Sequence, residues 1–146
     1  MQFSGSVDIN APRDRVWAFV SDLREVGSCG PGVESIDAVD ATHFTAHAKV
    51  SLGFIVAGII VNLEVLEADP PDRVVFRASG QAQGTAVDAT GELRLSGPAG
   101  GPTTLDWSAS VAISGAFAGA GSRLIETSAD RQIGQAFDCI RAKLEA

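Results

Sequence analysis

The chain has 146 residues, of which 18 are acidic and 11 are basic, so its net charge is −7. Hydrophobic residues make up 45% and charged residues 20%, which is the composition of an ordinary globular domain with a core of its own. A nucleic-acid surface needs clustered Lys and Arg to displace counterions, and the sequence has no such cluster. The same acidic charge would be repelled by anionic lipid, so any membrane contact must rest on apolar residues.

The N-terminal residues indicate a cellular location, and the spacing of the two cysteines indicates their chemical state. Residues 1–5 enter a strand pattern directly, without a basic start followed by an apolar signal core, so we expect a cytoplasmic protein. Cys29 and Cys139 have neither the spacing of metal ligands nor that of a disulfide framework. We therefore expect two free thiols, buried or half-buried.

The first third of the chain predicts one strand and two short helices. Residues 3–9 alternate apolar and polar side chains, which is typical of a half-buried strand. Pro12 favours the first turn of a helix, in which Val16, Trp17 and Val20 share one side. A second helical piece at 21–26 ends in a run rich in glycine and proline.

Strand patterns then continue without interruption as far as Gly115. The predicted strands are 33–38, 44–50, 54–67, 74–81, 87–95 and 105–113, with turns at 51–53 and 69–72 and a loop at 96–102. Six consecutive strands with short turns predict an antiparallel sheet. The apolar face of such a sheet must be buried against another element of the fold.

The last stretch, from Phe117 to Leu144, predicts one long helix. Its apolar stripe recurs at steps of three and four and consists of Ile125, Ala129, Ile133, Phe137, Ile140 and Leu144. At 1.5 Å per residue this helix would span roughly 40 Å, enough to cover the sheet. The predicted fold is α+β: one domain over residues 1–146, with a curved antiparallel seven-stranded sheet wrapped around the C-terminal helix and two short helices after the first strand.

Small residues occupy many inward positions of the predicted elements. They are Ala46, Ala48, Ala57, Ala78, Gly80, Ala89, Gly91, Ala109, Ala129 and Ala136. A sheet curved around a helix encloses a wide space, which only large side chains would fill. We therefore expect an open interior. The alternative is that the sheet lies closer to the helix over these small residues.

A set of short motifs, spread over nearly the full length, carries a resemblance to a known fold. Its members are Gly5, Ala11-Pro12, Val16-Trp17, Asp22, Cys29, Pro31-Gly32-Val33, Val50–Gly53, Glu67–Pro71, Thr104-Leu105, Gly115 and Gly121-Ser122-Arg123-Leu124-Ile125. With these motifs the chain resembles the helix-grip fold of START lipid-transfer domains and birch-pollen allergens, within the START-like (SRPBCC) superfamily. More closely, it resembles the G-subunit family of carbon monoxide dehydrogenase.

This resemblance implies a non-catalytic accessory protein that links a molybdenum carbon monoxide dehydrogenase, or a related hydroxylase, to the membrane. Electrons from such an enzyme end in respiratory quinone, so the expected cargo is an isoprenoid quinone such as menaquinone, bound in a hydrophobic cavity. The expected location is the cytoplasm, peripheral at the inner face of the cell membrane. The expected ligand contacts are Phe44, Ile55, Ile59, Val61, Phe76, Trp107, Val111, Phe117, Leu124, Ile125, Ala129 and Ile133.

A row of apolar residues near the turn at 51–53 is expected to touch the membrane or the partner enzyme. Its members are Leu52, Phe54, Val56 and Ile60. The last three alternate with the inward set of their strand and therefore face outward, where apolar rows usually mark a contact surface. Burial under a neighbouring loop or in a dimer is the alternative.

No residue pattern predicts catalysis, a metal site or a resident cofactor. His43 and His47 would stand about 13 Å apart on the wet face of one strand, too far to share a metal. The inward set is aliphatic and aromatic, and the chain has no Tyr, so an acid–base pair cannot be assembled from it. Two alternatives to the carrier stay open: a membrane-recruitment or assembly module for the dehydrogenase without ligand transport, and a polyketide-cyclase-like enzyme.

Overall fold

A computed structural model describes residues 1–30, 32–52, 55–82, 84–115 and 122–145. Its elements are β1 (Gln2–Ile9), α1 (Arg13–Val20), α2 (Leu23–Gly27), β2 (Val33–Ala38), β3 (His43–Leu52), β4 (Ile55–Asp69), β5 (Arg73–Ala82), β6 (Thr85–Ser96), β7 (Thr103–Gly115) and α3 (Ser122–Glu145). The predicted order of one strand, two short helices, six strands and one long helix is confirmed.

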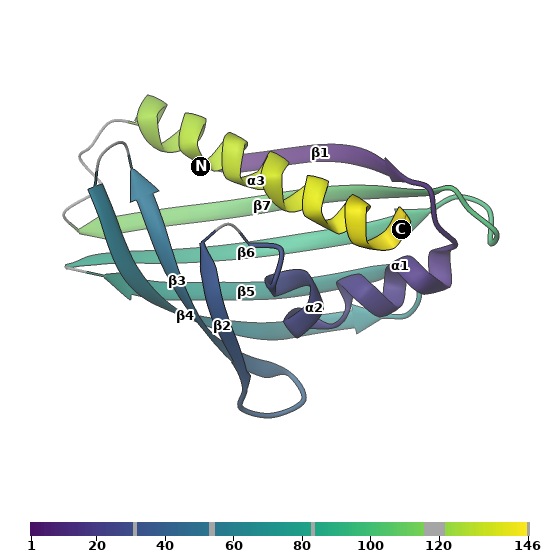
Figure 1. Ribbon diagram of the computed structural model, residues 1–146, viewed down its shortest axis with the longest axis horizontal. Helices are drawn as coiled ribbons and strands as arrows, with labels where there is room; N and C mark the ends of the chain where they lie inside the picture. The colour runs from purple at the N-terminus through teal and green to yellow at the C-terminus, as the bar shows by residue number, and fades with distance from the viewer. Residues whose placement is uncertain (31, 53–54, 83, 116–121, 146) are drawn as a thin grey trace.

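The seven strands form one antiparallel sheet in the order β1-β7-β6-β5-β4-β3-β2. The sheet is therefore a meander from β2 to β7, with β1 added beside β7. Figure 1 shows that the sheet curves strongly. As a result, β2 and β3 run at a steep angle to β5, β6 and β7. Helix α3 runs across one face of this sheet, which confirms the helix-grip architecture.

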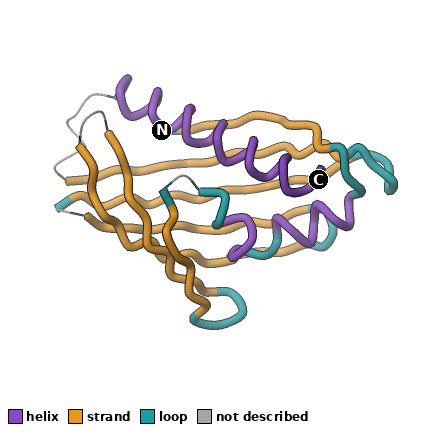
Figure 2. The backbone as a smooth tube through the Cα atoms, viewed as in Figure 1, coloured by secondary structure: helices purple, strands orange, loops and turns teal. Residues whose placement is uncertain are grey.

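The two short helices form where the sequence predicts them. In α1, Val16 and Val20 are buried and Trp17 is half-buried, so the predicted apolar side faces the core. Helix α2 begins after Asp22, whose carboxylate accepts a hydrogen bond of 3.0 Å from the backbone N–H of Arg24. Both helices cover the same end of the sheet as the C-terminal half of α3 (Figure 2).

The packed core lies at this end of the molecule. It consists of Ile9, Ala11, Val16, Val20, Cys29, Val74, Leu93, Leu95, Leu105, Ile140 and Leu144, all of which are buried. Ile140 and Leu144 are the last two residues of the predicted apolar stripe of α3. The C-terminal half of the helix is thus part of the packed core.

The expectation of two free thiols is wrong, because Cys29 and Cys139 form a disulfide. Cys29 follows α2 and Cys139 lies on α3, with their Cα atoms 5.5 Å apart. The two residues are 110 positions apart in the sequence. Spacing along the chain could not reveal this pairing, because only the docking of α3 beside α2 brings the two cysteines together.

The boundaries of the hairpin between β3 and β4 differ slightly from the prediction. Ser51 and Leu52 belong to β3 rather than to the turn, and β4 continues to Asp69. Phe54 and Phe117 lie outside the described residues. The helix α3 is described from Ser122 onward.

Candidate ligand-binding face

The register of the strands defines one continuous apolar face of the sheet, which is turned toward α3 and is called the inner face here. Residues directly opposite each other in antiparallel strands point to the same side. One such row consists of Ile36, Ala46, Val61, Gly80, Val87 and Ile113, and the next consists of Ala38, Phe44, Leu63, Ala78, Ala89 and Val111. The ring of Trp107, on the same face, lies 5.4 Å from that of Phe137 on α3.

On β6 and β7, burial along the inner face falls from one end of the strands to the other. On β7, Leu105 is fully buried, whereas Trp107, Val111 and Ile113 are only half-buried. On β6, Leu95 and Leu93 are buried, and the following inward positions Gly91, Ala89 and Val87 are half-buried. Apolar side chains that face the inside of a domain and still meet solvent mark an incompletely filled interior.

Three large side chains of the inner face lie flat over glycines instead of standing up from the sheet. A Cβ added at Gly91 would stand 3.0 Å from the ring of Phe76, and one at Gly80 would stand 2.9 Å from Cδ1 of Ile59. A Cβ at Gly5 would stand 2.9 Å from the indole of Trp107. Aromatic cover of strand glycines is a known way to stabilise a sheet.

Several polar contacts reinforce the attachment of the C-terminal half of α3. The Lys143 ammonium donates to Oγ of Ser28 at 3.0 Å, and Oε2 of Glu145 accepts from the backbone N–H of Asn10 at 3.0 Å. Together with the disulfide and the contact between Phe137 and Trp107, they hold residues 137–145 against the end of α2, the end of β1 and β7. Farther toward its N-terminus, Ile133 is half-buried.

The structure brings the described part of the predicted ligand set together on the inner face. Phe44 is buried, and Ile59, Val61, Phe76, Trp107, Val111 and Ile133 are half-buried. The remaining predicted contacts fall outside what the structure describes: Phe117 as a residue, and Ile55, Leu124, Ile125 and Ala129 as side chains.

The predicted outward row is described at two of its four positions. Val56 and Ile60 on β4 are 61% and 52% exposed, so they face away from α3 as expected. Phe54 and the side chain of Leu52 lie outside the described residues. Exposed apolar side chains of this size are candidates for a contact surface.

The inner face is chemically almost uniform. At the inward strand positions whose side chains are described, there is no Asp, Glu, Lys, Arg or His. The hydroxyl of the buried Thr103 donates to the carbonyl oxygen of Ala11 at 2.8 Å. Within the described ranges, no group of His, Cys, Asp and Glu could hold a metal ion. The described side chains of this face thus offer apolar contact area and include no acid–base pair.

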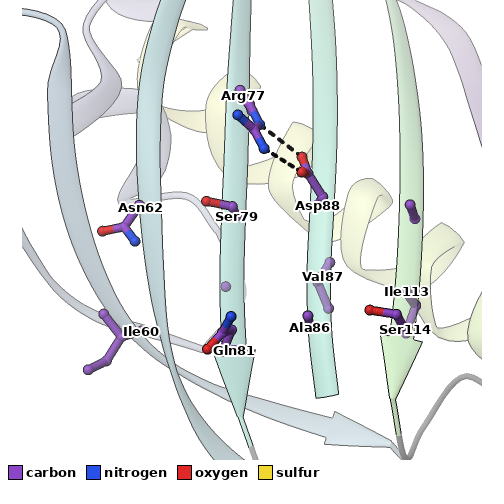
Figure 3. Close-up of a pocket in the computed structure, with 12 residues that line it drawn as sticks. Ile60, Asn62, Arg77, Ser79, Gln81, Ala86, Val87, Asp88, Ile113 and Ser114 are labelled. Carbon is purple, nitrogen blue, oxygen red and sulfur yellow. Dashed lines mark hydrogen bonds and ion pairs between the residues drawn. The ribbon is translucent and has the colours of Figure 1, made fainter. Parts of the chain in front are cut away.

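The opposite, outer face carries a groove that sequence reasoning missed. It measures about 750 Å³, and its outward-facing lining residues are Ile60, Asn62, Arg77, Ser79, Gln81, Ala86, Asp88, Ala112 and Ser114. Gly80, Val87 and Ile113 also border it, although the strand register assigns these three positions to the inner face. Figure 3 shows it with α3 behind the sheet. Arg77 donates two hydrogen bonds to Asp88, at 3.0 and 2.5 Å, which lower the pKa of Asp88 and raise that of Arg77. Because the pair is satisfied, the groove presents no unpaired charge from these two residues.

A second polar cluster lies at the hairpin between β2 and β3. Asp40 accepts hydrogen bonds from the backbone N–H of Thr42 and from His43, and these lower its pKa to about 2. In return, the hydrogen bond to Asp40 raises the pKa of His43, to which Glu64 also contributes from 3.5 Å. The cluster is exposed, and it organises the turn.

Together, the curved sheet, the long helix across it and the apolar inner face define a START-like helix-grip protein. The sequence profile of the carbon monoxide dehydrogenase G-subunit (CoxG) family matches residues 5–145, and the chain belongs to this family. A search of curated protein sequences finds no match. None of the described helices is both long and apolar enough to cross a membrane.

Solved structures of the same fold come from several bacteria. A conserved protein from Geobacillus kaustophilus has a TM-score of 0.89 at 20% identity, covering 99% of this chain and 95% of its own. The Zhui aromatase/cyclase from Streptomyces sp. R1128 has a TM-score of 0.73 at 14% identity, over 99% and 93% of the two chains. A START superfamily protein from Mycobacterium smegmatis has a TM-score of 0.72 at 12% identity, over 99% and 97%. At these identities the similarity establishes the fold alone.

Proposed function

We propose that this protein is a non-catalytic carrier that holds an apolar ligand, an isoprenoid quinone such as menaquinone, between the inner face and α3. The observation that carries the proposal is the row of half-buried inward positions of β7 from Trp107 to Ile113, with their neighbours on β4, β5 and β6, whose described side chains include none that is ionisable. An apolar ligand that covers this area releases the water in contact with it. This release contributes about 25 cal/mol of favourable free energy per Å² of apolar area buried. An isoprenoid chain matches such a surface, because it consists of hydrocarbon alone.

Membership of the CoxG family supports the choice of cargo and partner. We propose that the protein serves a molybdenum carbon monoxide dehydrogenase, or a related hydroxylase, by moving quinone between that enzyme and the membrane. The exposed Val56 and Ile60 would touch the bilayer or the enzyme during this transfer. Such contact would be peripheral and transient, at the inner face of the cell membrane.

Two other functions compete with the carrier. A membrane-recruitment or assembly module would use the exposed Val56 and Ile60 and leave the inner face empty. A cyclase-like enzyme is suggested by the similarity in fold to the Zhui aromatase/cyclase. The inner face argues against the enzyme, because its described inward positions carry no ionisable side chain that could move a proton.

Lipid extraction of the purified protein, followed by mass spectrometry, tests the proposal. We expect about one isoprenoid quinone per chain, or uptake of one menaquinone-4 from phosphatidylcholine vesicles by protein purified empty. The variant Ala89→Phe adds bulk to a small inner-face position and should lower uptake by about tenfold. Ala112→Phe adds the same bulk on the outer side of β7 and serves as the matched control.

The outcomes separate the three functions. A folded protein that carries no lipid, takes up no menaquinone-4 and still binds the dehydrogenase would overturn the carrier in favour of recruitment. Turnover of a polyketide by the purified protein would favour the enzyme. Equal uptake by the wild type, Ala89→Phe and Ala112→Phe would place the ligand somewhere other than the inner face.

A further inference from the structure

Among the described side chains of the inner face, the indole N–H of Trp107 is a hydrogen-bond donor to which no described residue supplies an acceptor. Among the inward strand positions whose side chains are described, only Thr103 and Trp107 have a donor. The hydroxyl of Thr103 is already bonded to the carbonyl of Ala11. Within the described part of the chain, no acceptor is assigned to Nε1 of Trp107. Indole N–H groups in apolar surroundings usually find a partner.

The indole is held in place by its two neighbours. It lies over Gly5, where an added Cβ would stand 2.9 Å from both Cζ2 and Nε1 of the ring. From the side of α3, the ring of Phe137 contacts it at a centroid distance of 5.4 Å and an interplanar angle of 32°. The position of the N–H is thus set by the backbone of β1 below and by an anchored part of α3 beside it.

Trp107 also marks the inner limit of the open part of the face. The preceding inward residue on β7, Leu105, is fully buried, whereas Val111 and Ile113, farther along the same strand, are half-buried. A ligand lying along β7 would therefore end at the indole. The polar end of that ligand would meet the indole N–H, and its apolar remainder would lie on the aliphatic positions beyond.

We propose, building on the carrier function, that Trp107 selects the cargo by donating a hydrogen bond from Nε1 to an acceptor oxygen of the ligand, such as a quinone carbonyl. The headgroup then lies at the deep end of the inner face, beside Phe137. The isoprenoid tail runs along Val111 and Ile113 toward the end of the sheet where β3 joins β4. The indole N–H is not among the buried unpaired atoms of the described residues, so it meets solvent in the ligand-free protein. A hydrocarbon that covered it would leave it unpaired at a free-energy cost, whereas a carbonyl would accept its hydrogen bond.

The matched pair of variants is Trp107→Phe and Trp17→Phe. The first keeps an aromatic ring over Gly5 and removes the N–H, and the second changes the only other Trp of the chain, on α1. The probes are menaquinone-4 and squalene, an isoprenoid hydrocarbon without oxygen, both supplied in phosphatidylcholine vesicles. We expect Trp107→Phe to weaken menaquinone-4 binding about 3- to 10-fold, as the loss of one hydrogen bond implies. Squalene binding should stay unchanged, and Trp17→Phe should alter neither.

The indole resonances of the wild-type protein give a second measurement that does not depend on a variant folding. With ¹⁵N-labelled tryptophan, two indole N–H signals are expected from the two Trp residues, and each variant assigns one of them. Menaquinone-4 should move the Trp107 proton downfield, as a new hydrogen bond does. Squalene should leave it in place.

Each outcome decides the proposal. If menaquinone-4 binds while the Trp107 signal and the affinity of Trp107→Phe stay unchanged, Trp107 does not bind the headgroup, although the carrier function stands. Equal losses for both probes in Trp107→Phe would show that the ring acts through packing, which also overturns the proposal. If the wild type binds neither probe, the carrier function itself is wrong and the role of Trp107 fails with it.

Discussion

The ring of Phe76 on β5 covers Gly91, its direct partner on β6, so closely that a Cβ at residue 91 would stand 3.0 Å from Cε2 of the ring. Glycine at this position therefore lets the ring lie along the sheet. The variant Gly91→Val should push the ring toward α3 and into the space proposed for the ligand. We expect menaquinone-4 uptake to fall about tenfold, because overpacking costs on the order of 1–3 kcal/mol.

The control for this prediction is Gly58→Val. An added Cβ at Gly58, an exposed position of β4, meets nothing within 4 Å. The variant Gly58→Val therefore tests the effect of a valine in the same sheet without changing the inner face. Equal uptake by both variants would show that the placement of Phe76 does not limit the ligand.

The exposed Val56 and Ile60 lead to a prediction about membrane contact. Replacing both with Asp should lower the fraction of protein bound to phosphatidylcholine vesicles by about tenfold or more, because each lost apolar contact costs about 1.5 kcal/mol. The thermal midpoint should change little, since both side chains are exposed. Sedimentation with vesicles measures the bound fraction. Val39→Asp, at another position that is 68% exposed, is the control and should bind as the wild type does.

The disulfide between Cys29 and Cys139 should contribute substantially to stability. It closes a loop of 110 residues, and loop entropy alone predicts a loss of about 5 kcal/mol on reduction. Urea unfolding with and without a phosphine reductant measures this loss. The variant in which both cysteines are replaced with Ser should unfold at the lower midpoint with or without the reductant. If unfolded protein kept free of reductant shows two reactive thiols, the disulfide does not form.

The pair formed by Asp40 and His43 should titrate abnormally. The pKa of His43 is raised above 6.5 by its hydrogen bond to Asp40, so its stabilising effect is complete below the unfolded pKa and is lost as pH rises through the folded pKa. The pKa of Asp40 is lowered to about 2, so its contribution to stability has the opposite pH dependence. This contribution is present above pH 3.8 and is lost as the pH falls toward 2.

An NMR titration of the His43 imidazole measures this coupling. In Asp40→Asn the pKa of His43 should fall, because the carboxylate that stabilises the imidazolium is gone. Asp37→Asn, which changes a neighbouring acidic residue of β2, is the control and should leave His43 as in the wild type. A His43 pKa that does not respond to Asp40→Asn would mean that the hydrogen bond between the two side chains is absent in solution.

Much of the candidate site could be predicted from the sequence because a strand alternates its faces. Phe44, Val61, Phe76 and Val111 are assigned inward by a period of two, and the register places them on one face. The outward direction of Val56 and Ile60 follows from the same rule and is confirmed. Small residues at inward positions predict an open interior, and the half-buried inner face supports that interpretation.

The features that could not be predicted all join residues far apart in the chain. The pair of Arg77 and Asp88 spans two strands, and opposite charges at outward positions of consecutive strands were the one available signal for it. The covering of Gly5 by Trp107 depends on β1 pairing with β7, about a hundred residues later. No local pattern encodes such a contact.

The sequence by itself determined the order of the elements, the two faces of the sheet and the apolar stripe of α3, since hydrophobic periodicity is a local property of the chain. Only the tertiary structure decided that Cys29 meets Cys139, that the core lies at one end, and that the indole N–H of Trp107 lies on the open part of the inner face without an acceptor among the described residues. These properties depend on how far the sheet curves and where α3 is anchored. Both follow from the packing of the whole domain rather than from any one segment.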